Sequence, residues 1–91
     1  MKLSIIIPTY NEKDNVSKIF YDLEKELSKF DISYEIIFVD DNSPDGTGEI
    51  LENLKNQNAN LKVIHREGKL GLSSAVILGT RFADGNIIGV M

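Results

Sequence analysis

The clearest structural signal in the chain is a hydrophobic run that leads straight into a polar turn, Tyr34-Glu35-Ile36-Ile37-Phe38-Val39-Asp40-Asp41-Asn42-Ser43-Pro44-Asp45-Gly46. The apolar residues of its first half are continuous rather than alternating, which is typical of a strand covered on both faces of a parallel sheet. The second half is dense in Asp, Asn, Pro and Gly, the residue types that form turns. The run therefore predicts a buried parallel strand followed by a loop at its carboxyl end.

Segments on both sides of this run repeat the alternation of strand and helix. Apolar, β-branched runs predict strands at residues 3–7, 34–39, 61–64 and 87–91, and apolar residues three and four apart predict helices at residues 14–30, 47–56 and 71–83. Pro8 is expected to end the first strand, and Asn11 or Asp14 to cap the first helix. The order predicts an α/β fold of three layers, a parallel sheet of four strands in the order 3-2-1-4 with helices on both faces.

Composition restricts the classes of protein to which the chain can belong. Its 91 residues allow one domain, residues 1–91, and no more. The formal net charge of -4 disfavours nucleic-acid binding, because an acidic surface repels the phosphate backbone. The absence of cysteine excludes disulfides and thiolate metal sites. No run approaches the roughly 18 to 20 apolar residues of a membrane span, so we expect a cytoplasmic protein.

The first candidate binding segment follows the first strand and contains Pro8, Tyr10 and Glu12. Ligands of open α/β sheets sit beyond the carboxyl ends of the strands, where these side chains are expected. The Tyr10 ring can stack on a base, and the Glu12 carboxylate can accept hydrogen bonds from ribose or base. The structural alternative is a strand end followed by a helix start, with Glu12 favouring the helix dipole.

The second candidate is the pair Asp40 and Asp41 after the second strand. Two adjacent carboxylates repel one another, and a turn needs only one such residue. A carboxylate here can accept from a base N–H, or bind ribose as the acid after the second strand does in dinucleotide folds. The alternative is a loop whose Asp and Asn side chains satisfy their own backbone.

The third candidate is the pair of cations Arg66 and Lys69 after the third strand. Together with the N-terminus of the next helix, they are placed to meet a diphosphate. The alternative is that both are ordinary solvated charges on a loop. His65 is the single histidine of the chain and is assigned no role.

Motifs of several other nucleotide-binding and catalytic classes are missing. The turn after the first strand has no glycine, which disfavours a dinucleotide-binding Rossmann domain, and there is no Walker lysine motif, H-E-x-x-H or nucleophile elbow. A non-catalytic flavodoxin-like module, in its sharpest version a phosphate receiver, is the alternative to an enzyme. Receivers need an acid pair after the first strand and an Asp after the third, and this chain has neither.

The segments taken together resemble the start of family 2 glycosyltransferases. The resemblance is carried by Ile5-Ile6-Ile7-Pro8-Thr9-Tyr10-Asn11-Glu12 and by Glu35-Ile36-Ile37-Phe38-Val39-Asp40-Asp41-Asn42-Ser43-Pro44-Asp45-Gly46-Thr47. The extension Ser43-Pro44-Asp45-Gly46-Thr47, followed by Lys69-Leu70-Gly71-Leu72 and Gly79, is most similar to dolichyl-phosphate (polyprenyl-phosphate) mannosyltransferases. These segments cover nearly the whole chain.

This resemblance implies a nucleotide-diphospho-sugar transferase fold of the GT-A type, of which the chain would form half. It implies that Pro8, Tyr10 and Glu12 contact the nucleoside and that Asp41, with Asp40 beside it, recognises the base. The implied reaction transfers a hexose, typically mannose from GDP-mannose, to a polyprenyl (dolichyl) phosphate. A divalent cation, Mg²⁺ or Mn²⁺, would neutralise the leaving diphosphate in the full-length enzyme.

The chain departs from the family pattern at its end. In the family the fourth strand runs into an Asp-x-Asp motif that holds the metal and the diphosphate, and residues 87–91 are that strand here. We therefore expect an N-terminal fragment without catalytic or metal-binding residues and without transferase activity of its own. The acceptor is expected to bind the absent half of a parent protein at the cytoplasmic face of a membrane. The uncovered fourth strand is expected to favour self-association.

Overall fold

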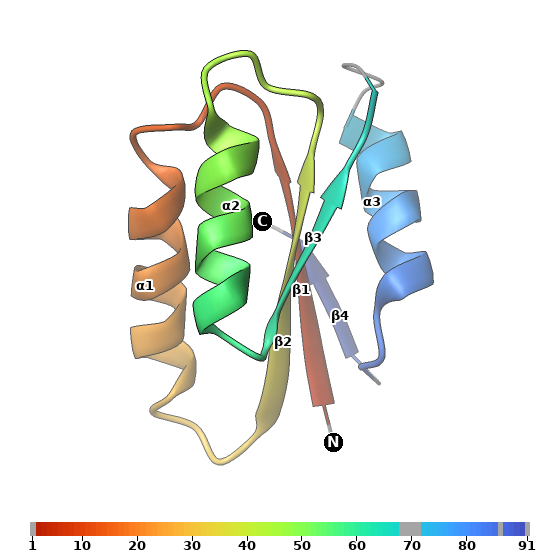
Figure 1. The fold of residues 1–91 in the computed structure, drawn as a ribbon. Coiled ribbons are helices and arrows are strands. Elements are labelled where there is room, and N and C mark those ends of the chain that lie inside the picture. The colour runs from red at the N-terminus through yellow and green to blue at the C-terminus, as the bar shows by residue number, and fades with distance from the viewer. Residues whose placement is uncertain (1, 68–71, 86, 91) are drawn as a thin grey trace.

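The computed structural model describes residues 2–67, 72–85 and 87–90 and shows strands alternating with helices (Figure 1). The strands are β1 (Lys2–Thr9), β2 (Ser33–Asp40), β3 (Leu61–His65) and β4 (Ile87–Val90), and the helices are α1 (Val16–Leu27), α2 (Thr47–Gln57) and α3 (Leu72–Phe82). All strand pairs are parallel and the order is β3-β2-β1-β4, which confirms the predicted topology. None of the helices in the described part of the chain is long and apolar enough to cross a membrane.

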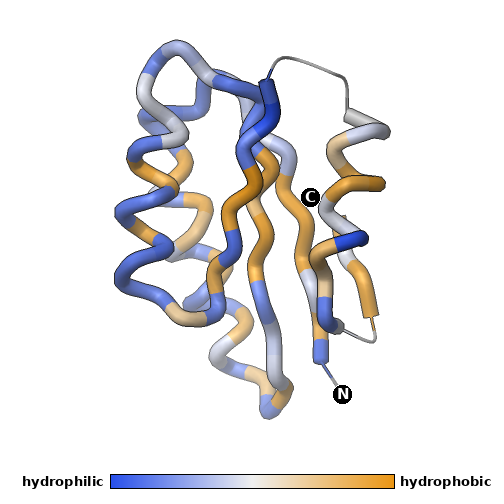
Figure 2. The backbone as a smooth tube through the Cα atoms, turned by 45° about the vertical axis from the view of Figure 1, so that its right-hand side comes forward, coloured by the Kyte–Doolittle hydropathy of each residue, from blue (hydrophilic) through white to orange (hydrophobic). Residues whose placement is uncertain are grey.

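The sheet is the middle of three layers, with α1 and α2 on one face and α3 on the other (Figure 1). Side chains alternate between the faces along each strand, so each face has its own buried cluster. The cluster under α1 and α2 is Ile5, Ile7, Val16, Phe20, Ile36, Phe38, Leu51, Leu54 and Leu61, and the cluster under α3 is Ile6, Ile37, Val39 and Ala75. Burial on both faces explains the hydrophobic stretches along the strands (Figure 2).

Helix α3 packs closely against β1 at Gly79. A Cβ atom added to this residue would lie 2.6 Å from Cγ2 of Ile6, far inside van der Waals contact. Protein interiors are packed too densely to absorb such an overlap without movement. Gly79 therefore sets how near α3 lies to the sheet.

Pro8 lies inside β1, so the prediction that it ends the strand was wrong. The C=O of Thr9 accepts from the Asp41 N–H at 3.1 Å on the β2 side, and the nitrogen of the preceding residue therefore faces the other side of β1. On that side the described pairing with β4 ends at Ile6. Among the described residues, the missing N–H of Pro8 therefore breaks no hydrogen bond of the ladder.

Helix α1 begins at Val16, and its N-cap residue Asn15 makes no side-chain capping bond. The prediction that Asn11 or Asp14 caps this helix was therefore wrong. The Asn15 amide group instead donates to Glu12 Oε2 at 3.2 Å. The C=O of Glu12 accepts from the N–H groups of Asn15 and Val16 at 3.0 and 2.8 Å, so the backbone itself leads the chain into the helix.

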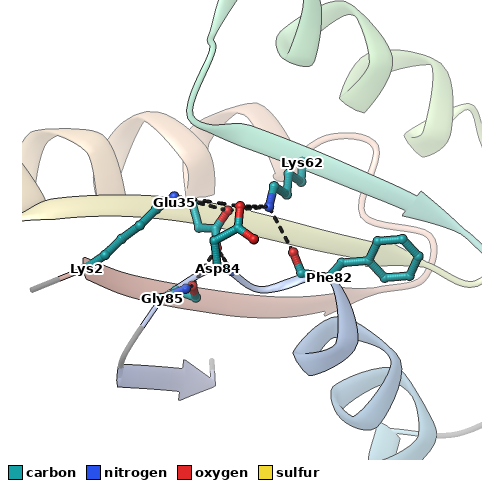
Figure 3. A network of polar contacts seen from close by, with 7 residues as sticks. Lys2, Glu35, Lys62, Phe82, Asp84 and Gly85 are labelled. Atoms are coloured by element: carbon teal, nitrogen blue, oxygen red, sulfur yellow. Dashed lines mark hydrogen bonds and ion pairs between the residues drawn. The ribbon is translucent and has the colours of Figure 1, made fainter.

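A polar network centred on a buried carboxylate joins the amino-terminal ends of β1, β2 and β3 (Figure 3). At its centre is the Glu35 carboxylate on β2, which accepts from Ser4 Oγ and from the Asp84 N–H, both at 2.6 Å. Lys62 Nζ on β3 lies 2.8 Å from the other Glu35 oxygen. Ser4 Oγ in turn accepts from the Gly85 N–H at 2.9 Å. The turn before β4 is thus bound to both β1 and β2.

The partners of Glu35 keep its carboxyl ionised although the residue is only 3% exposed. Burial alone, the largest single influence, would raise the pKa of this carboxyl. Hydrogen bonds from Lys62, Ser4 and the Asp84 N–H together outweigh burial, and the pKa falls from 4.5 to about 2. In return, hydrogen bonds to Asp84 and Glu35 raise the pKa of Lys62.

Candidate functional site

The described residues proposed for nucleotide binding all lie at the carboxyl edge of the sheet. They are Pro8, Tyr10 and Glu12 at the end of β1, Asp40 and Asp41 at the end of β2, and Arg66 after β3. The remaining proposed residue, Lys69, lies outside the residues that the structure describes. Strands β1 and β2 pair in register as far as Thr9 and Asp40, so the loops that follow them start side by side.

Strand alternation sends the two neighbouring acids to opposite faces of the sheet. Phe38 belongs to the cluster under α1 and α2, and Val39 belongs to the cluster under α3. Asp40 continues the face of Phe38, and Asp41 continues the face of Val39. The two acids therefore have different surroundings although they are adjacent in the sequence.

On the α3 face, Asp41 and Arg66 form a buried ion pair with two parallel bonds. Arg66 Nε lies 2.5 Å from Asp41 Oδ1, and Arg66 Nη2 lies 2.8 Å from Asp41 Oδ2. Arg66 Nη1 donates to Ser74 Oγ on α3 at 2.8 Å. Asp41 is 7% exposed and Arg66 is 8% exposed. The planar guanidinium is therefore held in one orientation from β2 and α3 together.

This Asp41–Arg66 pair has the chemistry of a site for a nucleobase edge. An ionised carboxylate offers about four lone-pair sites, and the two bonds from Arg66 leave it able to accept from further N–H groups. A guanidinium matches planar acceptors such as ring carbonyls. Pro8 alternates with Ile6, a member of the α3 cluster, and so faces the same side of the sheet.

On the opposite face, the Asp40 carboxylate is held within the protein by three hydrogen bonds. Its Oδ1 accepts from Thr9 Oγ1 at 3.0 Å and from Ser43 Oγ at 2.7 Å, and its Oδ2 accepts from the Ser43 N–H at 3.1 Å. The side chain is 2% exposed. Asp40 therefore anchors the turn that follows β2.

The segment after β1 turns sharply and leaves Tyr10 38% exposed. Asn11 has a φ of 54°, in the left-handed region that Asn tolerates better than most residues. Asn42, which follows Asp41, has a φ of 52°. Both loops thus change direction within two residues of their strands.

An open cavity of about 610 Å³ lies on the α2 side of the Asp40 turn. His65 and Glu52 line it, and His65 Nε2 lies 2.6 Å from Glu52 Oε1. This hydrogen bond lowers the pKa of Glu52. Of the described residues proposed for nucleotide binding, Asp40 alone lines this cavity, and the Asp41–Arg66 pair lies outside its lining.

Sequence reasoning missed the side chains that orient the proposed contacts. Ser74 holds Arg66 from α3, and a serine near the start of the helix after β3 was the available signal. His65 was assigned no role, because nothing local predicts that it meets Glu52 on α2.

Within the described ranges, no group of three acids or histidines is arranged to hold a metal ion.

Comparison with known proteins places the chain among sugar-transferring enzymes. Residues 4–91 match the family model of glycosyl transferase family 2. The chain is 45% identical over 91 residues to a dolichol-phosphate mannosyltransferase of Pyrococcus furiosus, and 38% identical over 95 residues to one of Saccharomyces cerevisiae. Both alignments cover 100% of this chain but only 25% and 34% of those proteins, so the chain spans about a quarter to a third of their length.

Solved structures share the arrangement of this sheet and its helices. The mannosyltransferase PcManGT of Pyrobaculum calidifontis, in complex with GDP-Man and Mn²⁺, superposes with a TM-score of 0.78 at 23% identity, over 94% of this chain and 25% of that chain. Residues 1–349 of S. aureus TarS, in complex with UDP, superpose with a TM-score of 0.77 at 32% identity, over 100% of this chain and 27% of that chain. The shared architecture is the GT-A fold. From the match over residues 4–91 and the shared fold, we conclude that the chain belongs to glycosyltransferase family 2.

Proposed function

We propose that this chain forms the nucleotide-sugar-binding part of a transferase that moves mannose from GDP-mannose to a polyprenyl (dolichyl) phosphate. The observation that carries the proposal is the buried Asp41–Arg66 pair at the carboxyl edge of the sheet, where ligands of open parallel sheets bind. Relatives named dolichol-phosphate mannosyltransferase, 45% and 38% identical, support mannose as the sugar and this acceptor, and the P. calidifontis mannosyltransferase in complex with GDP-Man supports the donor. Family membership also weighs against the receiver-type alternative.

In this proposal the base meets the Asp41–Arg66 pair. Guanine presents its N1–H and N2–H side by side with O6 next to them, so one carboxylate can accept both N–H groups while a guanidinium donates to the oxygen. Uracil presents a single N–H between two carbonyls. The pair therefore favours GDP over UDP by one hydrogen bond to a charged group, about 1.5–3 kcal/mol or roughly ten- to a hundredfold in affinity.

The other proposed contacts complete the nucleotide site. Tyr10 stacks on the base, Pro8 packs beside it, and the Glu12 carboxylate accepts from ribose hydroxyls. Lys69, on the segment between β3 and α3, meets the diphosphate. Asp40 contributes indirectly in this proposal. It lies on the opposite face, and its hydrogen bonds with Ser43 hold the turn that follows β2.

A divalent cation, Mg²⁺ or Mn²⁺, belongs to the proposal for the complete enzyme, where it would neutralise the leaving diphosphate. The complex of the P. calidifontis mannosyltransferase contains Mn²⁺ together with GDP-Man. The residues that the present structure describes do not make an ion site by themselves. We also propose that the complete enzyme works at the cytoplasmic face of a membrane, where a polyprenyl phosphate is available.

Amide-shift titration by NMR with GDP and with UDP tests the proposal. We expect shifts centred on Tyr10, Asp41 and Arg66, and tighter binding of GDP. Asp41→Asn keeps the shape of the side chain and removes its charge. This variant is expected to weaken GDP binding by about tenfold or more and to abolish the preference over UDP.

Asp22→Asn is the matched control for this substitution. Asp22 lies on the outer side of α1 with a 63% exposed side chain that pairs only with Lys18 among the ion pairs described. Its replacement should leave both affinities unchanged. Equal affinity of the wild-type chain for GDP and UDP, or wild-type selectivity in D41N, contradicts the assignment of the base site.

A further inference from the structure

We infer that Ser43, Asp45 and Thr47 are positioning residues for the ribose of the nucleotide, acting through the backbone on both sides of Glu12. The inference rests on the proposed function, in which Glu12 contacts the ribose. Its basis is a set of hydrogen bonds between the two loops that follow β1 and β2.

Three successive backbone N–H groups after β1 donate to side chains of the loop after β2 and of the first residue of α2. The N–H groups of residues 11, 12 and 13 reach Ser43 Oγ at 2.9 Å, Thr47 Oγ1 at 3.0 Å and Asp45 Oδ2 at 3.1 Å. All three residues precede α1, which begins at Val16. Side chains of the second loop and of Thr47 thus supply acceptors to N–H groups that no backbone hydrogen bond of a helix or sheet satisfies here.

The two accepting hydroxyls are themselves oriented by carboxylates. Ser43 Oγ donates to Asp40 Oδ1 at 2.7 Å, and Thr47 Oγ1 donates to Asp45 Oδ1 at 2.5 Å. With the hydrogen of each hydroxyl directed at a carboxylate, its lone pairs face the backbone N–H. The bond from the Thr47 hydroxyl also lowers the pKa of Asp45. The contacts of residues 11 and 12 therefore each run from amide to hydroxyl to carboxylate, and the charged carboxylate strengthens both hydrogen bonds of the chain.

These contacts fix the peptide groups on both sides of Glu12. Its N–H is bonded to Thr47, its C=O accepts from the Val16 N–H at 2.8 Å, and its carboxylate accepts from Asn15 Nδ2 at 3.2 Å. A carboxylate held in this way loses little freedom when it accepts from a ribose hydroxyl. Preorganisation of this kind raises affinity because less conformational entropy is lost on binding.

Thr47→Val is the variant that tests the inference. Valine keeps the shape of this fully buried side chain and removes only the hydroxyl, whereas the matched control Thr47→Ser keeps the hydroxyl. Affinities for GDP and for 2',3'-dideoxy-GDP are measured by NMR titration, because the dideoxy ligand offers Glu12 no ribose hydroxyl. We expect T47V to weaken GDP binding about five- to tenfold and to leave the dideoxy ligand unchanged, with T47S close to wild type.

Amide spectra recorded before each titration establish that the variants are folded. If T47V is not folded, Ser43→Ala with Ser43→Thr as its match makes the same comparison through the N–H of residue 11, and the same ligand-selective loss is expected. Equal loss for both ligands, or no loss for either, overturns the inference and leaves the proposed function standing. A wild-type chain that binds no GDP overturns the proposed function itself.

Discussion

Asp40 and Asp41 are neighbours in the chain, and their carboxylates lie on opposite faces of the sheet. Asp40 is bonded to Thr9 and Ser43 beside the α2 layer, whereas Asp41 is bonded to Arg66, which α3 holds through a serine. Asp40 shapes the loops, and Asp41 is the acid that we propose to meet the base. Substitutions at the two positions should therefore have separable effects on stability and on nucleotide selectivity.

Asp40→Asn is expected to lower the free energy of unfolding by about 1–3 kcal/mol, because an amide offers one acceptor oxygen where Thr9 and Ser43 now use two. The preference for GDP over UDP should remain, since the Asp41–Arg66 pair lies on the other face. Urea unfolding followed by circular dichroism measures the first effect, and nucleotide titration measures the second. A D40N variant with unchanged stability and lost selectivity would reverse the roles of the two acids.

The fold was predictable because its signals are local. Continuous apolar runs, turn residues and helical spacing each act over a few residues, and the handedness of crossovers then restricts the strand order. The position of Pro8 inside a strand was not predictable. A strand tolerates proline where the neighbouring strand offers no partner for the missing N–H, and the sequence around Pro8 does not show where that neighbour ends. The placement of Asp40 and Asp41 on opposite faces was not predictable either. It follows from strand alternation only because β2 continues to Asp40, one residue beyond the predicted strand. The partners of Glu35 come from distant segments, so the residues next to Glu35 in the sequence do not predict them.

Gly79→Ala should destabilise the protein, because the new Cβ would lie 2.6 Å from Cγ2 of Ile6. Overpacking of a dense interface typically costs about 1–3 kcal/mol. Gly89→Ala is the matched control, because a Cβ at that position would meet its nearest atom at 3.9 Å, an ordinary contact. Thermal unfolding of both variants checks the prediction, and a G79A melting temperature equal to that of G89A would show that α3 moves away freely.

Stability is expected to fall in acid as Glu35 becomes protonated. The folded protein lowers the pKa of this carboxyl from 4.5 to about 2, so its ionised form contributes stability that is present above about pH 5 and is lost as the pH falls through about 2. Glu35→Gln should remove this part of the pH dependence. Urea midpoints measured at steps between pH 5 and pH 2 give the slopes.

The control for this substitution is Glu26→Gln, because Glu26 lies on the outer side of α1 with a 65% exposed side chain that pairs with Lys29. E26Q should keep the acid slope of the wild type. If E35Q also keeps it, another group is responsible for the loss of stability in acid.

Strand β4 is expected to mediate self-association of this chain. Ile87, Ile88 and Val90 are 45%, 41% and 52% exposed, and among the described strands β4 pairs only with β1. Its residues include no charge or proline to protect an edge. Sedimentation velocity should show a sedimentation coefficient that rises with concentration, and Val90→Lys should hold the chain closer to the monomer.

Ile77→Lys is the control for this effect, since Ile77 is similarly exposed, at 57%, but lies on α3 and not on β4. I77K should sediment like the wild type. If I77K reduced self-association and V90K did not, the contact between copies would involve α3 and not β4.

The contacts to Glu35 join segments that are far apart in the chain, with Ser4 31 residues before it and Asp84 49 residues after it. The Glu35 carboxylate can accept from the Asp84 N–H only after α3 has packed against the sheet, because α3 returns the chain to the amino edge. In kinetic terms, the docking of β4 is then a late event of folding and an early event of unfolding, because contacts of long sequence separation are slow to close. Native-state hydrogen exchange should accordingly show the β4 amides opening before those of β2, as a separate cooperative unit of the domain.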